Sequence, residues 1–154
     1  MRKNIRLRHW DYSNAGCYHV TICTHDKAML FGSVKHPDEA PAYVELSSLG
    51  VFCEETIGQI HDRFPGAQVL NHVVMPNHVH LLLSLQGPES PELGRVVQFF
   101  KTRVTREARR DKPGFVVWQA RYHDHIVRNE RDMLRTWEYI DENPLKWGND
   151  EYYW

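Results

Sequence analysis

The chain has 154 residues, of which 42% are apolar, 12% aromatic and 25% charged, and this composition excludes disordered and collagen-like chains and predicts one globular domain over residues 1–154. Nineteen Lys and Arg against twenty Asp and Glu leave a formal net charge of −1, so any affinity for nucleic acid must come from a local cluster of charge. The three cysteines show no C-x-x-C spacing, which argues against a disulfide framework or a cysteine-rich zinc site, so we expect reduced core thiols. No apolar run reaches the roughly 18 residues of a membrane span. We therefore expect a cytoplasmic protein with no membrane partner.

The first predicted elements are strands. Residues 18–23 alternate apolar and polar side chains and are rich in β-branched residues, which favours a half-buried strand. Residues 43–46 predict a second, short strand. The turn-rich segment 32–41 between them is short enough to be a hairpin connection or an insertion.

A helix and two strands follow. Apolar residues recur at helical spacing over 49–64, with Ser47 or Ser48 as the N-cap and Pro65 ending the run. Residues 68–74 and 78–85 then predict two strands separated by a Met-Pro-Asn break. The second strand is expected to be central and deeply buried.

The last third predicts a helix, a strand and a final helix. Ser90-Pro91-Glu92 offers an N-cap, a proline at the first helical position and an acid in the first turn, ahead of apolar residues at helical spacing. Residues 115–126 predict a strand, and 128–143 predict a helix. The order indicates an α+β, ferredoxin-like (RRM-like) fold, an antiparallel sheet with helices packed on it and an added C-terminal helix.

Two pairs of histidines have the spacing of a half-site for metal. In a strand, residues two apart project from the same face, so His78 and His80 can converge on one ion while the intervening valine anchors the opposite face. Chance spacing is the alternative in a chain with ten histidines. His123 and His125 flank a charged aspartate instead, so we expect a hydrogen-bonded surface role for them.

The final helix supplies a nucleophile and an oxygen ligand. Tyr139 lies on the polar flank of this helix, away from its apolar stripe, and Asn143 lies one turn further on. Tyr139 can therefore face the same pocket as the histidines, as a nucleophile, with the Asn143 amide as a third ligand. The alternative is a boundary tyrosine with its hydroxyl in water.

The preceding helix has a basic face opposite its apolar stripe. Arginine dominates this face, and its planar fork suits phosphate better than lysine does, although a merely solvated face is the alternative. Trp118 and Tyr122 lie near further arginines and can stack bases, with core packing the expected place of Trp118. The residues predicted to bind phosphate are Arg95, Lys101, Arg103, Arg106, Arg110, Arg121 and Arg128.

Four motifs in order carry a family resemblance. MPNHVHLLL, FKTRVTREA, VWQARYHDHIVR and EYIDENPLKW resemble the single-tyrosine HUH transposases of bacterial insertion sequences (insertion sequence 200-like), especially the branch associated with repetitive extragenic palindromes. The resemblance implies that His78, His80 and Asn143 bind a divalent metal, Mg²⁺ or Mn²⁺, and that Tyr139 is the nucleophile. Asn143 is the asparagine form of that branch, where mobile elements typically carry glutamine, so a resident enzyme and a mobile one both stay open.

The implied activity is cleavage and rejoining of single-stranded DNA through a 5′-phosphotyrosine, at hairpin or palindromic sequences, with the protein associated with the nucleoid when bound. Monomer and homodimer both stay open. One alternative is a metal-dependent hydrolase that uses water and takes a carboxylate from Glu54, Glu55 or Asp124. Another is a catalytically degenerate nucleic-acid-binding module of ferredoxin-like fold. An RNA-binding module of this fold should show paired aromatic strand motifs, which are absent here.

Overall fold

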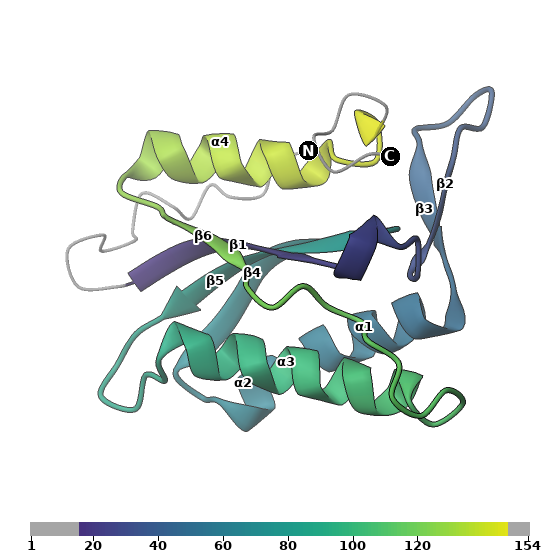
Figure 1. Cartoon of the computed structure of the whole chain (residues 1–154). Helices are drawn as coiled ribbons and strands as arrows, with labels where there is room; N and C mark the ends of the chain where they lie inside the picture. Colours follow the sequence, from purple (N-terminus) through teal and green to yellow (C-terminus); the bar gives the residue numbers. More distant parts are fainter. Residues whose placement is uncertain (1–15, 148–154) are drawn as a thin grey trace.

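A computed structural model describes residues 16–147 and has three layers (Figure 1). The middle layer is an antiparallel four-stranded sheet in the order β4-β5-β1-β6. Helices α1 and α3 cover one face of the sheet and α4 covers the other. The bounds are β1 (Gly16–Cys23), α1 (Ser48–Gly58), α2 (Ile60–Arg63), β4 (Ala67–Met75), β5 (His78–Leu85), α3 (Leu93–Ala108), β6 (His123–Ile126) and α4 (Glu130–Asp141). This arrangement confirms the predicted ferredoxin-like α+β fold.

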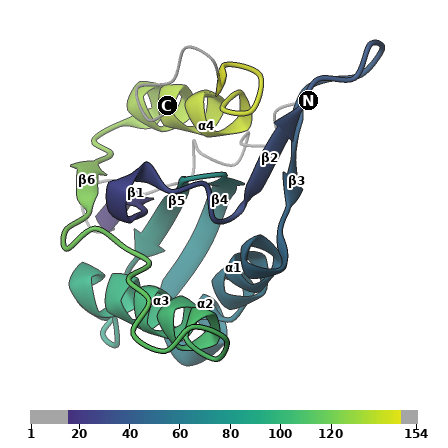
Figure 2. The ribbon, with the colours of Figure 1, turned by 45° about the vertical axis from the view of Figure 1, so that its right-hand side comes forward.

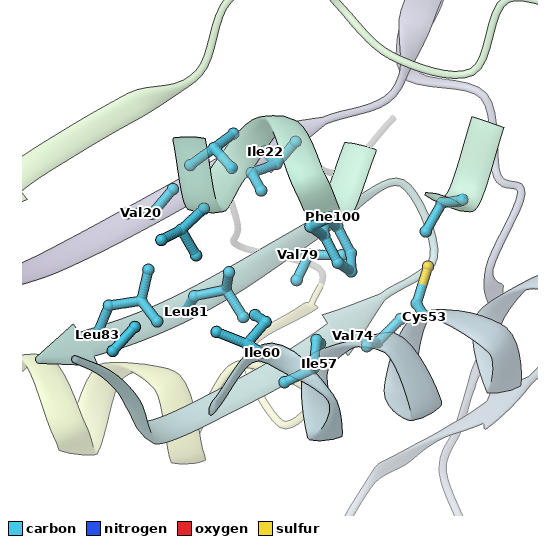
Figure 3. Close-up of a cluster of buried hydrophobic side chains, with 14 of the residues drawn as sticks. Val20, Ile22, Cys53, Ile57, Ile60, Val74, Val79, Leu81, Leu83 and Phe100 are labelled. Carbon is cyan, nitrogen blue, oxygen red and sulfur yellow. The ribbon is translucent and has the colours of Figure 1, made fainter. Parts of the chain in front are cut away.

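The larger core lies between the sheet and the helix pair α1 and α3 (Figure 3). Alternate residues of the central strands point into it, Val20 and Ile22 from β1 and Val79 and Leu81 from β5, and all four are fully buried. Phe100 of α3 packs against them. Because each buried side chain of this size contributes about 1.5–3 kcal/mol, this core fixes the pleat of β1 and β5. The residues between these core positions must therefore point to the α4 side.

The α4 side of the sheet is apolar only in part. Cys17 and Leu82 are buried there against Met133 and Ile140 of α4, and the cysteine is a reduced thiol as predicted. Further along the same strands the side chains are polar. A second, smaller core thus seats α4 and leaves a polar area beside it.

A two-stranded hairpin stands outside the main sheet (Figure 2). It consists of β2 (Gly32–Lys35) and β3 (Tyr43–Leu46), and a 3-10 turn, η2 (His25–Lys27), precedes it. The turn-rich segment 32–41 therefore holds a strand at its start and a hairpin connection in the rest. Among the described residues, no helix is both long and apolar enough to cross a bilayer.

The predicted strand over 115–126 is wrong for most of its length. Only the last four residues form β6, while Val117 and Trp118 are buried in irregular backbone. That backbone bonds to the chain around the end of β1, with His25 N–H donating to Val117 O and Gln119 N–H donating to Cys23 O. Alternating apolar residues here cover the core without a continuous strand partner.

The helix starts also differ from prediction. α3 begins at Leu93 after a cap position at Glu92, because Ser90 belongs to a preceding turn in which its N–H donates to Gly87 O. Ser47 caps α1 by accepting from Gly50 N–H, one of the two predicted caps, and the expected helix 49–64 is divided at Gln59 into α1 and α2.

Candidate active site

The two histidines of β5 lie on the sheet face beneath α4. His78 and His80 are 0% and 1% exposed, and their ring centroids are 4.8 Å apart. The Nδ1 atom of His78 lies 2.8 Å from Asn77 Oδ1, and Nδ1 of His80 lies 3.1 Å from Thr21 Oγ1. With Nδ1 engaged on both rings, Nε2 is the nitrogen of each ring that would bind a metal.

Burial keeps both imidazoles neutral. Desolvation lowers the pKa of His78 to about 4, while the polar side chain of Asn143 beside the ring acts in the opposite direction. Desolvation also lowers the pKa of His80 well below its usual range, and the neighbouring imidazoles of His78 and His19 lower it further. A neutral imidazole has the lone pair that metal coordination needs, so the pair is in the binding form at neutral pH.

Helix α4, which ends at Asp141 rather than at the predicted residue 143, brings Tyr139 to this pair, and the turn after the helix brings Asn143. The Tyr139 ring is 5.2 Å from the His80 ring and 39% exposed, so the tyrosine faces the histidines on one side and solvent on the other. Asn143 is 3% exposed, and its Nδ2 donates to Tyr139 O at 3.3 Å. Its Oδ1 is buried, and the amide lies beside the His78 ring. The four residues that the sequence predicts for the site are therefore close together.

Three residues of the site were missed by sequence reasoning. Nε2 of His19 lies 3.0 Å from His80 Nδ1, and Thr21 shares that nitrogen. Both are polar residues that alternate with buried valine and isoleucine on β1, a signal that could have marked a polar sheet face. Trp147, just beyond α4, stacks on His78 with ring centroids 6.3 Å apart and an angle of 14°.

The donor set fits a small divalent cation. Two neutral ring nitrogens and a buried amide oxygen are ligands that Mn²⁺ accepts, and Mg²⁺ would rely more on water and phosphate oxygens. Over the described part of the chain, no group of three His, Cys, Asp or Glu side chains could hold a metal ion. Any metal site built on the two histidines thus depends on Asn143 for its third protein ligand.

The carboxylates considered for a water-using hydrolase do not reach this site. Glu54 of α1 lies on the other face of the sheet and binds His72, with Nε2 and Oε1 2.7 Å apart. Glu55 is an exposed residue of the same helix. Asp124 pairs in register with Val20, whose side chain lies in the core on the α1 and α3 side. The structure therefore gives no support to the hydrolase alternative.

The second histidine pair lies at the sheet edge. All of β6 is exposed, and Nε2 of His125 lies 2.9 Å from Asp132 Oδ2 of α4. This contact confirms the hydrogen-bonded surface role that we predicted for His125. It also ties the first turn of α4 to the sheet.

The basic face of α3 lies on the opposite side of the sheet from Tyr139 (Figure 1). A groove of about 990 Å³ runs between α3 and residues 116–122, and Lys101, Arg106 and Arg110 line it. A smaller pocket on the other flank of the helix is lined by Arg95, Arg103 and Arg106. Four of the arginines predicted to bind phosphate, Arg95, Arg103, Arg106 and Arg110, thus line hollows on the two flanks of α3.

Some of the predicted phosphate contacts have other roles in the fold. Lys101 donates from Nζ to Gln119 O at 2.8 Å, and burial lowers its pKa. Arg110 forms an ion pair with Glu107 at 3.3 Å. Arg121 and Arg128 are exposed and lie before and after β6, outside both hollows. Trp118 is 7% exposed, packed in the core as predicted, although it also lines the groove.

Comparison with known proteins gives consistent results. The sequence profile of IS200-like transposases matches residues 14–143. An uncharacterized protein of Haemophilus influenzae is 33% identical over 172 aligned residues, which span 99% of this chain and 93% of that protein. Another protein of the same organism, assigned as a REP-associated tyrosine transposase, is 25% identical over 149 residues, 90% of this chain and 75% of its own.

Solved structures share the fold. A REP-associated tyrosine transposase bound to a REP hairpin matches with a TM-score of 0.64 at 20% identity, over 85% of this chain and 67% of that one. A transposase structure from Deinococcus radiodurans matches with a TM-score of 0.53 at 19% identity, over 82% of this chain and 88% of that one. At these identities the matches establish a common architecture.

Proposed function

Because the chain belongs to the IS200-like transposase family, we propose that it cleaves and rejoins single-stranded DNA through a covalent bond between Tyr139 and a 5′-phosphate. The observation that carries this proposal is the convergence of Tyr139 with His78, His80 and Asn143 under α4. In such a phosphoryl transfer, the tyrosine is the nucleophile, and the two histidines and the asparagine are ligands for a metal ion. The exposed flank of Tyr139 leaves room for a DNA strand to approach the phenol oxygen.

The proposed reaction is a transesterification in two directions. The Tyr139 oxygen attacks phosphorus and loses its proton, the bond to the 3′ oxygen breaks, and that oxygen leaves as a 3′-hydroxyl. The 5′-phosphate stays on the tyrosine, so the energy of the phosphodiester is kept without ATP. In rejoining, a 3′-hydroxyl attacks the phosphotyrosine and Tyr139 leaves. A phenol with a pKa of about 10 is a better leaving group than an alcohol, which makes the step reversible.

The residues around the tyrosine orient these groups. Asn77 and Thr21 contact Nδ1 of the two histidines, so Nε2 of each ring is the nitrogen that would hold a divalent ion, together with the Asn143 amide oxygen. A divalent ion held there would polarise the scissile phosphate and neutralise charge on its non-bridging oxygens. The DNA strand must also lie in line with the phenol oxygen, and the stacking of Trp147 on His78 helps to hold that histidine in place.

For the substrate we propose single-stranded DNA with a hairpin. The similar structure with TM-score 0.64 is of a protein bound to a REP hairpin. In this chain, a basic helix with arginine-lined hollows on both flanks supplies the charge that a DNA backbone requires. Since α3 and Tyr139 lie on opposite sheet faces, we place the hairpin stem on α3 and the cleaved strand at α4.

The test is capture of the covalent adduct. Wild type, Tyr139→Phe and the matched control Tyr43→Phe, at an exposed tyrosine of the β2–β3 hairpin, are incubated with labelled single-stranded hairpin pools and Mn²⁺ or Mg²⁺, then run on denaturing gels. We expect an adduct in wild type and in the control, lost with EDTA and in Tyr139→Phe. Cleavage that persists in Tyr139→Phe without an adduct would show water as the nucleophile and overturn the proposal.

A further inference from the structure

Three aromatic rings form a closed triangle at the site. Ring centroids are 5.0 Å apart for His19 and His80, 5.2 Å for His80 and Tyr139, and 5.8 Å for His19 and Tyr139. His19 thus contacts both the candidate metal ligand and the candidate nucleophile. We propose that His19 is a positioning residue that fixes the orientation of His80 and of Tyr139, an inference that rests on the function proposed above.

The first argument concerns the proton on His80. A neutral imidazole that binds metal through Nε2 must carry its proton on Nδ1 and donate it to an acceptor. Nδ1 of His80 has two acceptors within reach, His19 Nε2 at 3.0 Å and Thr21 Oγ1 at 3.1 Å. When His80 carries its proton on Nδ1, both partners can accept that proton, and Nε2 then holds the lone pair that a metal would use. His19 therefore acts on the metal site without touching the ion.

The second argument concerns the tyrosine ring. Tyr139 is on a helix surface and 39% exposed, and the His19 and His80 rings pack against it. Its contacts with His19 and His80 are both edge contacts, at 65° and 75° between ring planes, which are favourable arrangements for aromatic pairs. Without the His19 ring, Tyr139 would keep one of these two contacts. Its oxygen would then spend less time in line with the phosphate.

His19 is itself held in a rigid place. It lies in the middle of β1, paired with Leu82 of β5 on one side and with His125 of β6 on the other. His125 is in turn bound to Asp132 of α4, so the neighbours of His19 include the helix that carries the tyrosine. A residue on a central strand is a better platform than a loop residue for a group that must hold a geometry.

Three substitutions separate the two effects. His19→Phe keeps a ring against Tyr139 but removes the hydrogen bond to His80, His19→Ala removes both, and His19→Gln keeps an acceptor for His80 without the ring. His36→Gln, in the loop between β2 and β3, is the control. Circular dichroism and the melting temperature establish that each variant folds.

Mn²⁺ affinity is measured by electron paramagnetic resonance on the full chain without DNA, and adduct formation is measured at saturating Mn²⁺. We expect His19→Phe and His19→Ala to weaken Mn²⁺ binding about 10–100-fold, the loss that is typical when the hydrogen-bond partner of a metal ligand is removed. We expect His19→Gln to bind Mn²⁺ with nearly the wild-type affinity. At saturating Mn²⁺ we expect Ala and Gln to lower kcat with the KM for DNA unchanged, and Phe to keep kcat closer to wild type.

The outcomes separate this inference from the proposed function. If His19→Phe and His19→Ala bind Mn²⁺ and form the adduct as wild type does, the role of His19 is overturned while the proposed function stands. A wild type that binds no Mn²⁺ and forms no adduct overturns the proposed function itself. If His19→Ala does not fold, His19→Phe is compared with His19→Gln. Equal Mn²⁺ affinities in these two variants would contradict the role of the hydrogen bond between His19 and His80.

Discussion

Neutral histidines surround the candidate nucleophile, and their neutrality is a consequence of burial. Desolvation lowers the pKa of both His78 and His19 to about 4, and for His19 the nearby His125 lowers it further while Asp132 raises it. The protein therefore stabilises a form of these side chains that can coordinate metal, and it does so at the cost of their ability to take up protons.

Lowering the pH should destabilise the metal-free protein. An unfolded histidine has a pKa of about 6.5, so between about pH 6.5 and 4 the unfolded state binds more protons than the folded one, and the free energy of unfolding falls as the pH falls through this range. For His78 the loss approaches about 3 kcal/mol below pH 4. Urea unfolding in EDTA at pH 7 and 4.5 measures it. His78→Gln should show a smaller difference between the two pH values, and an equal difference would contradict the argument.

At the scale of elements, the two faces of helix α3 have different roles. Its apolar stripe, with Val96 and Phe100, closes the main core, and the opposite face carries the arginines. The stripe could be predicted from helical periodicity. That the arginines would line a groove with residues 116–122 could not, because the strand expected there is irregular backbone.

Neutralising two arginines of α3 should weaken DNA binding and reduce its dependence on salt. Arg103 and Arg106 line the pocket beside Phe99, and Arg106 lines the groove as well. Each lost phosphate contact should reduce the slope of log K against log salt by about 0.7–0.9. Fluorescence anisotropy of a labelled hairpin at several salt concentrations measures the slope for Arg103→Gln with Arg106→Gln. Lys35→Gln on the outlying hairpin is the control, and an unchanged slope in the arginine variant would place the DNA elsewhere.

Two strands have the bounds that the sequence predicted. β5 is buried along its whole length between the two faces of the sheet, and β3 is a short strand that pairs with β2, so turns or breaks mark the ends of both. The prediction of a strand over 115–126 was wrong because apolar residues there cover the core from irregular backbone. The prediction of Ser90 as a helix N-cap was wrong because that residue belongs to a preceding turn. Local patterns do not show which competing contact a residue makes.

The whole molecule places two candidate surfaces on opposite sides of one sheet. α4 follows the edge strand β6, and from there the chain could have covered either face. The spacing of the histidines, the polar flank of the last predicted helix and the family resemblance together predicted His78, His80, Tyr139 and Asn143, but not this separation. It also did not indicate His19, because its role depends on the pairing register of β1 with β5.

Mn²⁺ should raise the melting temperature of the folded chain. A ligand that binds only the folded state at about 100 times its Kd stabilises by about 2.7 kcal/mol, which for a domain of this size corresponds to about 5–10 °C. Differential scanning fluorimetry with Mn²⁺ and with excess EDTA measures the shift. His78→Ala should lose it, and an equal shift in that variant would place the ion at another site.

Tyr139 lies in the last turn of α4 and Asn143 in the turn that follows the helix, where the Asn143 amide N–H donates a hydrogen bond to the Tyr139 carbonyl. A displacement of α4 would therefore remove the nucleophile and the amide ligand in a single movement. By thermodynamic reciprocity, whatever favours the seated helix favours ion capture, and ion capture favours the seated helix by the same factor. Under the proposed function, the nucleophile and the amide ligand would then be present together or absent together.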